Sequence, residues 1–288
     1  MKPKRLPSSV RFMTTITKDF VRANDIDIHY IDAGTADAPT LVLLHGGLVS
    51  TSEIWAPTPI SYASHVQRLA EEFHIIAPDA RGSAMTSHSG GPVSMSMLAD
   101  DVSALIDALG LDRPAVAGFS EGGLAALLLG MRHPDSIRAL VCDSGYDLLN
   151  PNAPAFAMLP GLLGGLPHVD PDVVEQSFGQ DPEMAAVFAL MKADQDAACG
   201  EGYWRTYVER TLERWSHWPG YGYTDLAKIT VPTLILVGDR DHFCSVEEAT
   251  VAFRNLGHGQ LAVIPNIGHM ISGGKIEALV SFLTSQTW

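Results

Sequence analysis

A serine set between glycines is the first candidate for chemistry, in the stretch Gly118-Phe119-Ser120-Glu121-Gly122. An apolar run precedes the serine and an apolar helical pattern follows it, which places the hydroxyl at a sharp turn from a strand into a helix. Glycine on either side removes side chains that would collide in such a turn. The serine is therefore a candidate nucleophile, and the helix that begins after it directs its N-terminal amides toward the same place.

A serine hydroxyl alone is a weak nucleophile, so it needs a base, and the base needs an acid that orients it. His269, in the stretch IPNIGHM, offers the base in the loop after the last predicted strand. Asp239 and Asp241, in LVGDRDHF, follow the strand before it, and Asp143 follows an earlier strand. Asp241 occupies the second acidic position of its turn and is our predicted acid, with Asp239 and Asp143 as alternatives.

Attack on a carbonyl also needs amide donors for the oxygen that becomes negative. The loop that contains Gly46 and Gly47 follows an apolar run at 40–44 and has no bulky side chain at those two positions, so it can approach a substrate closely. Gly47 or Leu48 would donate one amide, and Glu121, the first residue of the helix, would donate the other. These residues together predict acyl transfer at Ser120.

The elements that must position these residues alternate between strand and helix. The first predicted strand has the polar and apolar alternation of an antiparallel strand, and the later ones are short apolar runs typical of strands buried on both faces. Helical periodicity follows several of these runs, which predicts an α/β fold with a mostly parallel central sheet and helices on both faces. The predicted strands lie within 26–34, 40–47, 73–82, 112–120, 137–145, 232–241 and 259–269, and the clearest helices at 97–110, directly after Ser120, at 246–255 and at 271–284.

One segment, 147–225, is far longer than a crossover between strands requires. We interpret it as an inserted helical lid on a core formed by 19–146 and 226–288, with residues 1–18 as an N-terminal arm. Its aromatic residues either form the small core of the insertion or line a substrate pocket. The candidates for lining such a pocket are Trp204, Trp215 and Trp218 in the segment, together with Phe119 and Phe243 beside the predicted catalytic residues.

The composition limits the partners of the protein. The formal net charge is −14, which disfavours binding to nucleic acids and to anionic membranes, and no apolar run approaches the roughly 20 residues of a membrane helix. Three widely spaced cysteines fit a reducing cytoplasm. No histidine or cysteine pair has the spacing of a zinc site, and the predicted chemistry requires no cofactor. We therefore expect a soluble cytoplasmic protein that acts on a small molecule without metal or cofactor.

Four motifs, which follow one another along the chain as oxyanion loop, elbow, acid turn and base, resemble those of the α/β-hydrolase superfamily. The resemblance covers nearly the whole chain except the arm and much of the lid. The resemblance identifies the nucleophile elbow at 118–122, the acid in the turn ending at Asp241 and the base at His269, and it identifies the oxyanion loop at 45–47. It implies that His45 is structural and braces this loop. The turn at 79–84 departs from the family pattern at Ala84, and serine at the elbow argues against the dehalogenase and epoxide-hydrolase branches.

The predicted function is hydrolysis of a carboxylic ester or lactone of a small, apolar or aromatic molecule through an acyl-enzyme on Ser120. Amide or peptide hydrolysis and carbon–carbon bond hydrolysis by the same residues stay open, because the lid carries carboxylates that would bind an ammonium group and basic residues that would bind a carboxylate. A non-catalytic small-molecule receptor is the alternative from another class. The sequence leaves a monomer and a homodimer both open.

Overall fold

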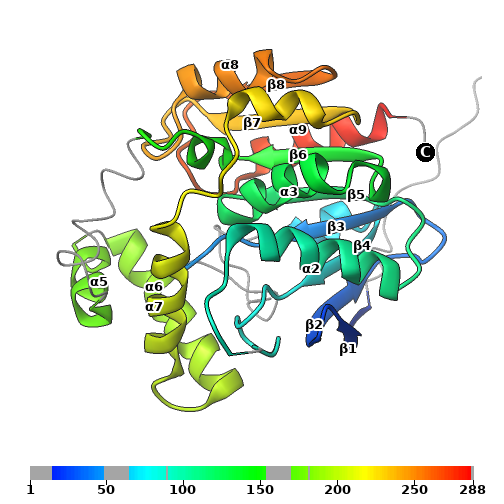
Figure 1. The fold of residues 1–288 in the computed structure, drawn as a ribbon. Coiled ribbons are helices and arrows are strands. Elements are labelled where there is room, and N and C mark those ends of the chain that lie inside the picture. Colours follow the sequence, from blue (N-terminus) through cyan, green and yellow to red (C-terminus); the bar gives the residue numbers. More distant parts are fainter. Residues whose placement is uncertain (1–14, 49–64, 89, 154–169, 181, 287–288) are drawn as a thin grey trace, which may run out of the picture.

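The computed structural model describes residues 15–48, 65–88, 90–153, 170–180 and 182–286. An eight-stranded sheet runs through the molecule in the order β1-β2-β4-β3-β5-β6-β7-β8 (Figure 1). β1 pairs antiparallel with β2 and β2 antiparallel with β4, whereas the remaining neighbours are parallel. The strands are β1 (Ile16–Ala23), β2 (Ile26–Ala33), β3 (Thr40–Leu44), β4 (His74–Pro78), β5 (Ala115–Phe119), β6 (Ala139–Asp143), β7 (Thr233–Gly238) and β8 (Gly259–Ile264).

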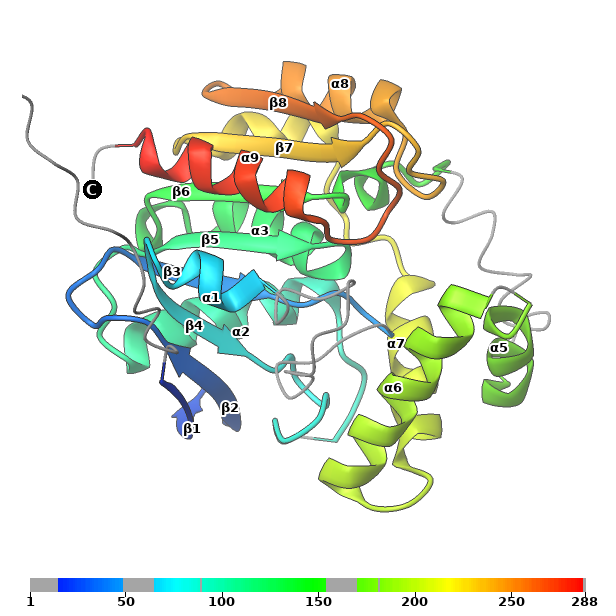
Figure 2. The ribbon, with the colours of Figure 1, turned by 180° about the vertical axis from the view of Figure 1, so that it is seen from behind.

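Helices cover both faces of this sheet, which confirms the predicted fold class. On one face lie α2 (Met95–Ala108), α3 (Glu121–Arg132) and α8 (Val246–Arg254), which contribute to one large buried cluster. On the other face, in front in Figure 2, lie α1 (Val66–Leu69) and α9 (Gly273–Thr284), whose apolar residues belong to a second cluster. Two apolar layers therefore enclose strands that are themselves apolar on both sides.

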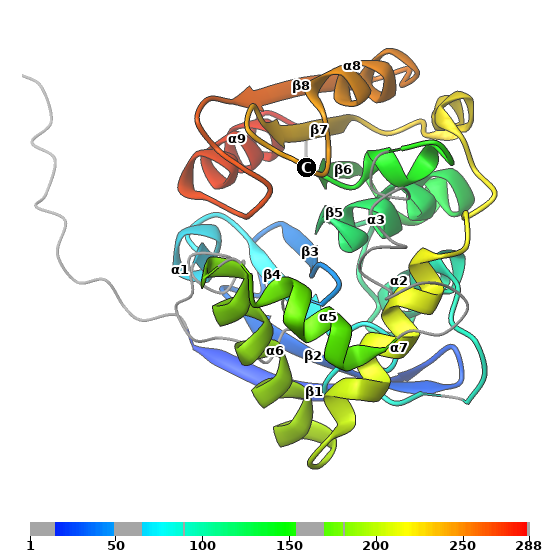
Figure 3. The same cartoon turned by 90° about the vertical axis from the view of Figure 1, so that its left-hand side faces the viewer.

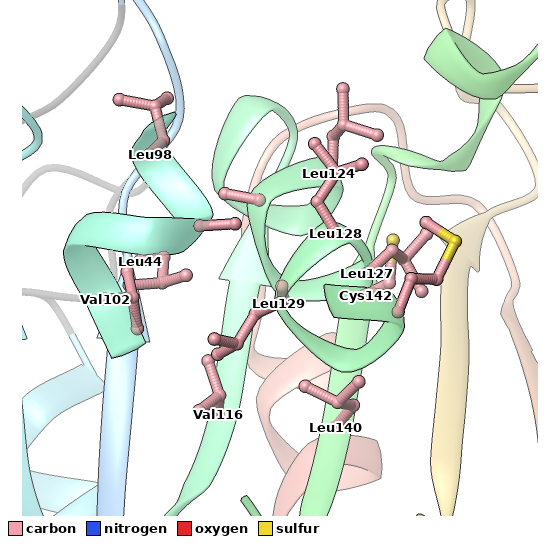
Figure 4. Packing of buried hydrophobic residues seen from close by; sticks show 14 of the residues in the cluster. Leu44, Leu98, Val102, Val116, Leu124, Leu127, Leu128, Leu129, Leu140 and Cys142 are labelled. Atoms are coloured by element: carbon pink, nitrogen blue, oxygen red, sulfur yellow. The ribbon is translucent and has the colours of Figure 1, made fainter. Parts of the chain in front are cut away.

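Helix α3 is buried around its whole circumference and fixes the position of Ser120 at its start. Its leucines pack against Val116 on β5 and Leu140 on β6 (Figure 4). A Cβ atom on Gly130 would lie 2.5 Å from Leu140 Cδ1, so the helix approaches the sheet too closely for a side chain there. Such packing restricts any shift of α3 along the sheet.

The first strand was not predicted, and it corrects the boundary of the core. β1 begins at Ile16, inside the segment expected to be an N-terminal arm. Most of its side chains are exposed, so its sequence lacks a buried apolar stripe, and its backbone pairs with β2 along the whole strand. Exposed edge strands of this kind depend on backbone pairing more than on apolar burial, which hides them from a hydrophobic pattern.

Three helices lie between β6 and β7 and form what we call the helical insertion: α5 (Pro171–Phe178), α6 (Pro182–Cys199) and α7 (Tyr203–Trp215). Short 3-10 turns, η3 (Tyr146–Leu149) and η4 (Tyr223–Lys228), lie on either side of it in the chain. The insertion lies beyond the carboxyl ends of the parallel strands, and Figure 3 looks onto this edge of the sheet. Residues 154–169 of the predicted lid and 1–14 of the predicted arm lie outside the described residues.

Hydrogen bonds attach the insertion to the turn that follows β4. The amide of Ala84 donates to Gln195 Oε1 (2.9 Å), and the Tyr203 hydroxyl donates to the carbonyl of Gly82 (2.8 Å). Leu48, from the loop after β3, is fully buried in the apolar cluster of the insertion. No helix in the described part of the chain combines the length and the apolar character needed to cross a bilayer.

Candidate active site

Ser120 sits in a strained backbone conformation between β5 and α3, with φ 53° and ψ −116°. This left-handed region is unfavourable for a residue with a side chain, and such strain is typical of functional turns. A Cβ atom on Gly118 would lie 2.0 Å from the carbonyl oxygen of Gly122, and one on Gly122 would lie 2.5 Å from that of Leu44. Only glycines fit at both positions, so the sequence pattern and the sharp turn have the same steric cause.

His269 lies in the loop between β8 and α9 and contacts the serine. Its Nε2 lies 3.1 Å from Ser120 Oγ, which is hydrogen-bonding distance. The rings of Phe119 and Phe243 pack beside the imidazole, with centroids 5.0 and 4.8 Å from its own. The other side of the loop is held by Lys275, whose Nζ donates to the carbonyl oxygen of His269 (2.7 Å).

Asp241 completes the chain of hydrogen bonds from the turn after β7. Its Oδ2 lies 2.9 Å from His269 Nδ1, and its Oδ1 accepts from the amides of Phe243 and Cys244 at 2.9 Å each. Burial alone would raise the pKa of this carboxyl, but the hydrogen bond and charge of His269 and the amide of Cys244 together hold it below its ordinary value. Asp241 is therefore ionised and able to stabilise a positive charge on the imidazole.

The two alternative acids are engaged elsewhere. Asp143, at the end of β6, is buried and pairs with the equally buried Lys275 at 2.8 Å. Burial raises the pKa of Asp143, although the charge of Lys275 opposes the rise. Asp239 is partly exposed and lies 3.7 Å from Arg240. Of the three carboxylates considered from the sequence, Asp241 is the one that the structure places on His269.

The predicted oxyanion loop follows β3 and passes close to the start of α3. His45 Nε2 accepts from the amide of Ala80 (2.9 Å), and its Nδ1 lies 2.8 Å from the carbonyl oxygen of Gly46. These contacts hold the loop in place, which is the structural role that the family resemblance implies for His45. The amide of Leu48 donates to the hydroxyl of Tyr207 (3.4 Å) in α7. Leu48 is thus directed into the insertion, which leaves Gly47 as the candidate donor on this loop.

A family model described as the alpha/beta hydrolase fold matches residues 39–274, which is most of the chain. The chain belongs to this family. The match includes Ser120, Asp241, His269 and the predicted oxyanion loop, and it confirms the family resemblance seen in the sequence motifs.

Several relatives of this chain are hydrolases by name. RutD of Caulobacter sp. (strain K31), a proposed carbamate hydrolase, is 32% identical over 125 residues, 43% of this chain and 44% of the relative. The chain therefore spans less than half the length of that relative. The 3-oxoadipate enol-lactonase 2 of Acinetobacter baylyi is 23% identical over 257 residues, covering 86% of this chain and 88% of the lactonase.

A solved structure supports the fold of this chain over almost its full length. The 2-hydroxy-6-oxo-6-phenylhexa-2,4-dienoate hydrolase (BphD) of Rhodococcus sp. strain RHA1 has a TM-score of 0.72, with 20% identity, and covers 94% of this chain and 98% of that one. At this identity the likeness shows the fold alone. The family match and this likeness together show the alpha/beta hydrolase fold.

The structure corrects the prediction for Trp204, which is buried inside the insertion, whereas the place of Trp218 in a pocket stays a prediction. Trp204 is 4% exposed inside the insertion, where Phe188 packs edge-on to it and Lys192 and Arg205 lie over its ring. Trp218 is 48% exposed, in the segment after α7. The first stabilises the insertion and the second belongs to the surface.

The remaining three aromatic candidates do lie near the hydrogen-bonded residues, but not all of them as pocket lining. Phe119 is fully buried and packs against the ring of His269, so it offers no surface to a substrate. Phe243 is partly buried and packs against the imidazole. Trp215, at the end of α7, donates from Nε1 to Glu121 Oε1 (2.7 Å) and lies against Gly47.

Residues with metal-binding side chains also meet here. Asp241, Cys244 and His269 offer ligand atoms within 4.8 Å of one another. However, Asp241 and His269 are hydrogen-bonded to each other, and Cys244 Sγ donates to Asp147 Oδ1 (2.9 Å). Burial raises the pKa of the Cys244 thiol well above its ordinary value, so the thiolate that a metal needs is disfavoured. All three cysteines of the chain are described and unpaired.

Sequence reasoning missed two cations that hold this site. Lys275 fastens the His269 loop to Asp143, and Arg214 in α7 pairs with Glu121. In the sequence Arg214 is one of several basic residues of the insertion. Each pair joins residues far apart in the chain, so no local motif connects them.

Proposed function

We propose that this hydrolase cleaves a carboxylic ester or a lactone of a small, apolar or aromatic molecule through an acyl-enzyme on Ser120. The observation that supports it best is the continuous hydrogen-bonded chain from Ser120 Oγ through His269 to Asp241, with distances of 3.1 and 2.9 Å. Each residue in this chain has the chemistry and the contact that its role requires. The small substrate follows from the insertion over the carboxyl edge of the sheet, which we propose acts as a lid.

In the first half of the reaction His269 Nε2 takes the proton of Ser120 as its oxygen attacks the carbonyl carbon. Asp241 keeps the Nδ1 proton of the imidazole in place and stabilises the imidazolium that forms. The amides of Gly47 and Glu121 donate to the oxyanion of the tetrahedral intermediate. His269 then gives its proton to the leaving alkoxide, and the alcohol departs.

In the second half a water molecule loses a proton to His269 and attacks the acyl-enzyme. Collapse of the second tetrahedral intermediate breaks the bond to Ser120 Oγ, which regains its proton from the imidazole, and the acid is released. In a lactone the alcohol and the acid belong to one molecule, so a single hydroxy acid leaves. The scheme involves no metal or cofactor.

Ester and lactone chemistry is also supported by the surroundings. Phe243 and Trp215 are aromatic residues beside His269 and Gly47, and flat apolar faces suit an apolar or aromatic substrate. An enol-lactonase is among the relatives that align over most of the chain. The unpaired cysteines support the further proposal that the protein works in the cytoplasm.

The test is labelling with a fluorophosphonate probe followed by turnover of aryl esters of increasing acyl length. We expect the native protein and Ser216→Ala, which removes an exposed serine of the insertion, to label and to turn over the esters equally. Ser120→Ala should not label and should lose about 10⁴-fold or more in kcat. Equal labelling of native protein and Ser120→Ala, or turnover that survives this substitution, would contradict the proposal.

A further inference from the structure

A buried carboxylate lies directly beside the proposed oxyanion donors. Glu121 follows the nucleophile, and its own amide is one of those donors, while its side chain is 2% exposed. A Cβ atom on Gly47, the residue proposed to supply the other amide, would lie 2.9 Å from Glu121 Oε2. A negative charge this close to both donors opposes the negative charge that develops on the substrate oxygen.

Arg214 is the group that cancels this charge. Its Nε donates to Glu121 Oε1 at 2.7 Å, and its terminal nitrogen lies 2.6 Å from the same oxygen. The guanidinium is as buried as the carboxylate, with 3% of its side chain exposed. Trp215 Nε1 adds a third donor to Oε1, at 2.7 Å. In surroundings of low polarity such a pair is close to neutral as a unit, whereas either partner alone carries an uncompensated charge.

The other charged groups around Glu121 have partners of their own. Behind it, a small cavity is shared with His45, Asp79, Arg81 and Asp101, of which Arg81 Nε donates to Asp101 Oδ2 (2.8 Å) and Asp79 lies 2.8 Å from His29. On the side of the insertion, Tyr207 has its pKa raised to about 12, by burial first and by the charge of Glu121 second. Among these groups Arg214 has the direct contact with the carboxylate.

We propose that Arg214 is a positioning residue for the reaction, which holds α7 against the nucleophile elbow and neutralises Glu121 so that the oxyanion can form. This inference rests on the proposed acyl transfer at Ser120. It assigns to the helical insertion a part in the chemical step in addition to covering the site. It also gives a reason for the buried ion pair between Arg214 of the insertion and Glu121 of the core.

We expect Arg214→Met to differ from the native protein in how its kcat depends on pH. In the native protein Arg214 offsets the charge of Glu121, so we expect kcat for an activated aryl ester to stay level at alkaline pH. In Arg214→Met the unpaired, buried Glu121 binds a proton more readily, because burial disfavours its charged form. As pH rises and Glu121 ionises, its charge opposes the oxyanion, so kcat falls by about tenfold or more at alkaline pH.

A second substitution separates this role from a structural one. Glu121→Gln is neutral and keeps an acceptor for Trp215, so Glu121→Gln/Arg214→Met should regain most of the native kcat at alkaline pH and lose the decline. Arg214→Lys keeps the charge with fewer donors, so we expect a level alkaline limb at a reduced kcat. Arg205→Met is the matched control on the same helix, since its ion pair with Asp172 is exposed, and its profile should match the native one.

The outcomes distinguish this inference from the proposed function. The inference is supported when the alkaline decline appears in Arg214→Met and disappears in the double variant. It is wrong if Arg214→Met keeps the native profile, or if the double variant is no more active than Arg214→Met, while the native protein labels and turns over normally. Absence of labelling and turnover in the native protein contradicts the proposed function, and with it the inference.

Discussion

Asp147 is a buried carboxyl group close to the proposed acid that the chemistry does not use. It is 3% exposed at the start of the segment after β6 and accepts a hydrogen bond from Cys244 Sγ (2.9 Å). Burial, with a contribution from the charge of Asp241, raises the pKa of Asp147 from 3.8 to about 6. At neutral pH the folded protein therefore contains an ionised carboxylate in surroundings that favour its neutral form.

This raised pKa makes stability depend on pH in a defined direction. Between pH 3.8 and about 6 the folded protein keeps a proton that the unfolded chain releases, so Asp147 lowers the free energy of unfolding as pH rises. Asp147→Asn stays neutral and still accepts from Cys244. We expect the variant to exceed the native protein in stability by about 2 kcal/mol at pH 8 and by clearly less at pH 5. Urea unfolding at the two pH values measures this, and an equal gain at both would show that ionisation is not the cause.

The residues proposed to do the chemistry could be predicted from the sequence because each belongs to a short motif with its own steric reason. Ser120, His269 and Asp241 all lie at predicted strand ends, and the structure brings them into contact. The ion pair of Glu121 with Arg214 could not be read, because it joins residues 93 positions apart. Such pairs follow from how the insertion docks on the core, which no local pattern contains.

The misplacement of Trp204 has a related cause within one helix. Trp204 and Trp215 both belong to α7 and lie about three turns apart, so they project from nearly the same side of the helix but roughly 16 Å apart along its axis. Of these two tryptophans, Trp215 is the one that lies against Gly47 of the oxyanion loop. Periodicity predicts the face of a helix, whereas the contact point along it depends on tertiary packing.

At the scale of elements, the buried parallel strands were predictable and the exposed first strand was not. β3, β5, β6 and β7 are apolar along nearly their whole length because both faces are covered, and the sequence shows each as a short apolar run. β1 lacks this signal because it is an exposed edge. Short α1 was not predicted either, since a single helical turn has no measurable period.

The end of β7, just before the proposed acid, lies close to the loop that carries the proposed base. A Cβ atom on Gly238, at the end of β7, would lie 2.1 Å from the carbonyl oxygen of Ile267. Gly238→Ala must therefore push the loop away or shift the strand. Since small displacements of a base from its nucleophile reduce catalysis strongly, we expect kcat for an aryl ester to fall by about tenfold or more and stability to fall by about 2 kcal/mol.

Gly273→Ala is the matched control for this prediction. Gly273 is the first residue of α9, beyond the same loop, and nothing lies within 4 Å of a Cβ atom placed there. Alanine at this position should leave kcat unchanged and stability equal or slightly higher, because alanine favours helix. If Gly238→Ala behaved like Gly273→Ala in kinetics and in urea unfolding, the contact between β7 and the base loop would have no functional importance.

At the scale of the whole molecule, the insertion and the sheet differ in how much apolar interior they possess. The sheet lies between two large clusters, whereas the insertion has one small cluster, which includes Phe188, Trp204 and Leu48. Hydrogen bonds connect the insertion to the core, mainly at the turn after β4 and at the elbow. A unit with a small apolar core and few hydrogen bonds to its neighbour unfolds locally at a lower free energy than the larger unit, so we expect the insertion to unfold before the sheet.

Phe188→Ala tests this division directly, because Phe188 is 2% exposed and packs against both Phe178 and Trp204. Removing a buried aromatic ring costs about 3 kcal/mol, and here the cost falls on the insertion alone. Native-state hydrogen exchange should show amides of α6 and α7 opening more easily by about this amount, with those of β5 and β6 unchanged. Since α7 carries Arg214 to the elbow, activity should fall with increasing temperature before the sheet unfolds. Equal loss of protection in β5 and β6 would mean instead that the insertion and the sheet unfold as one cooperative unit, and that the site is lost only when the whole molecule unfolds.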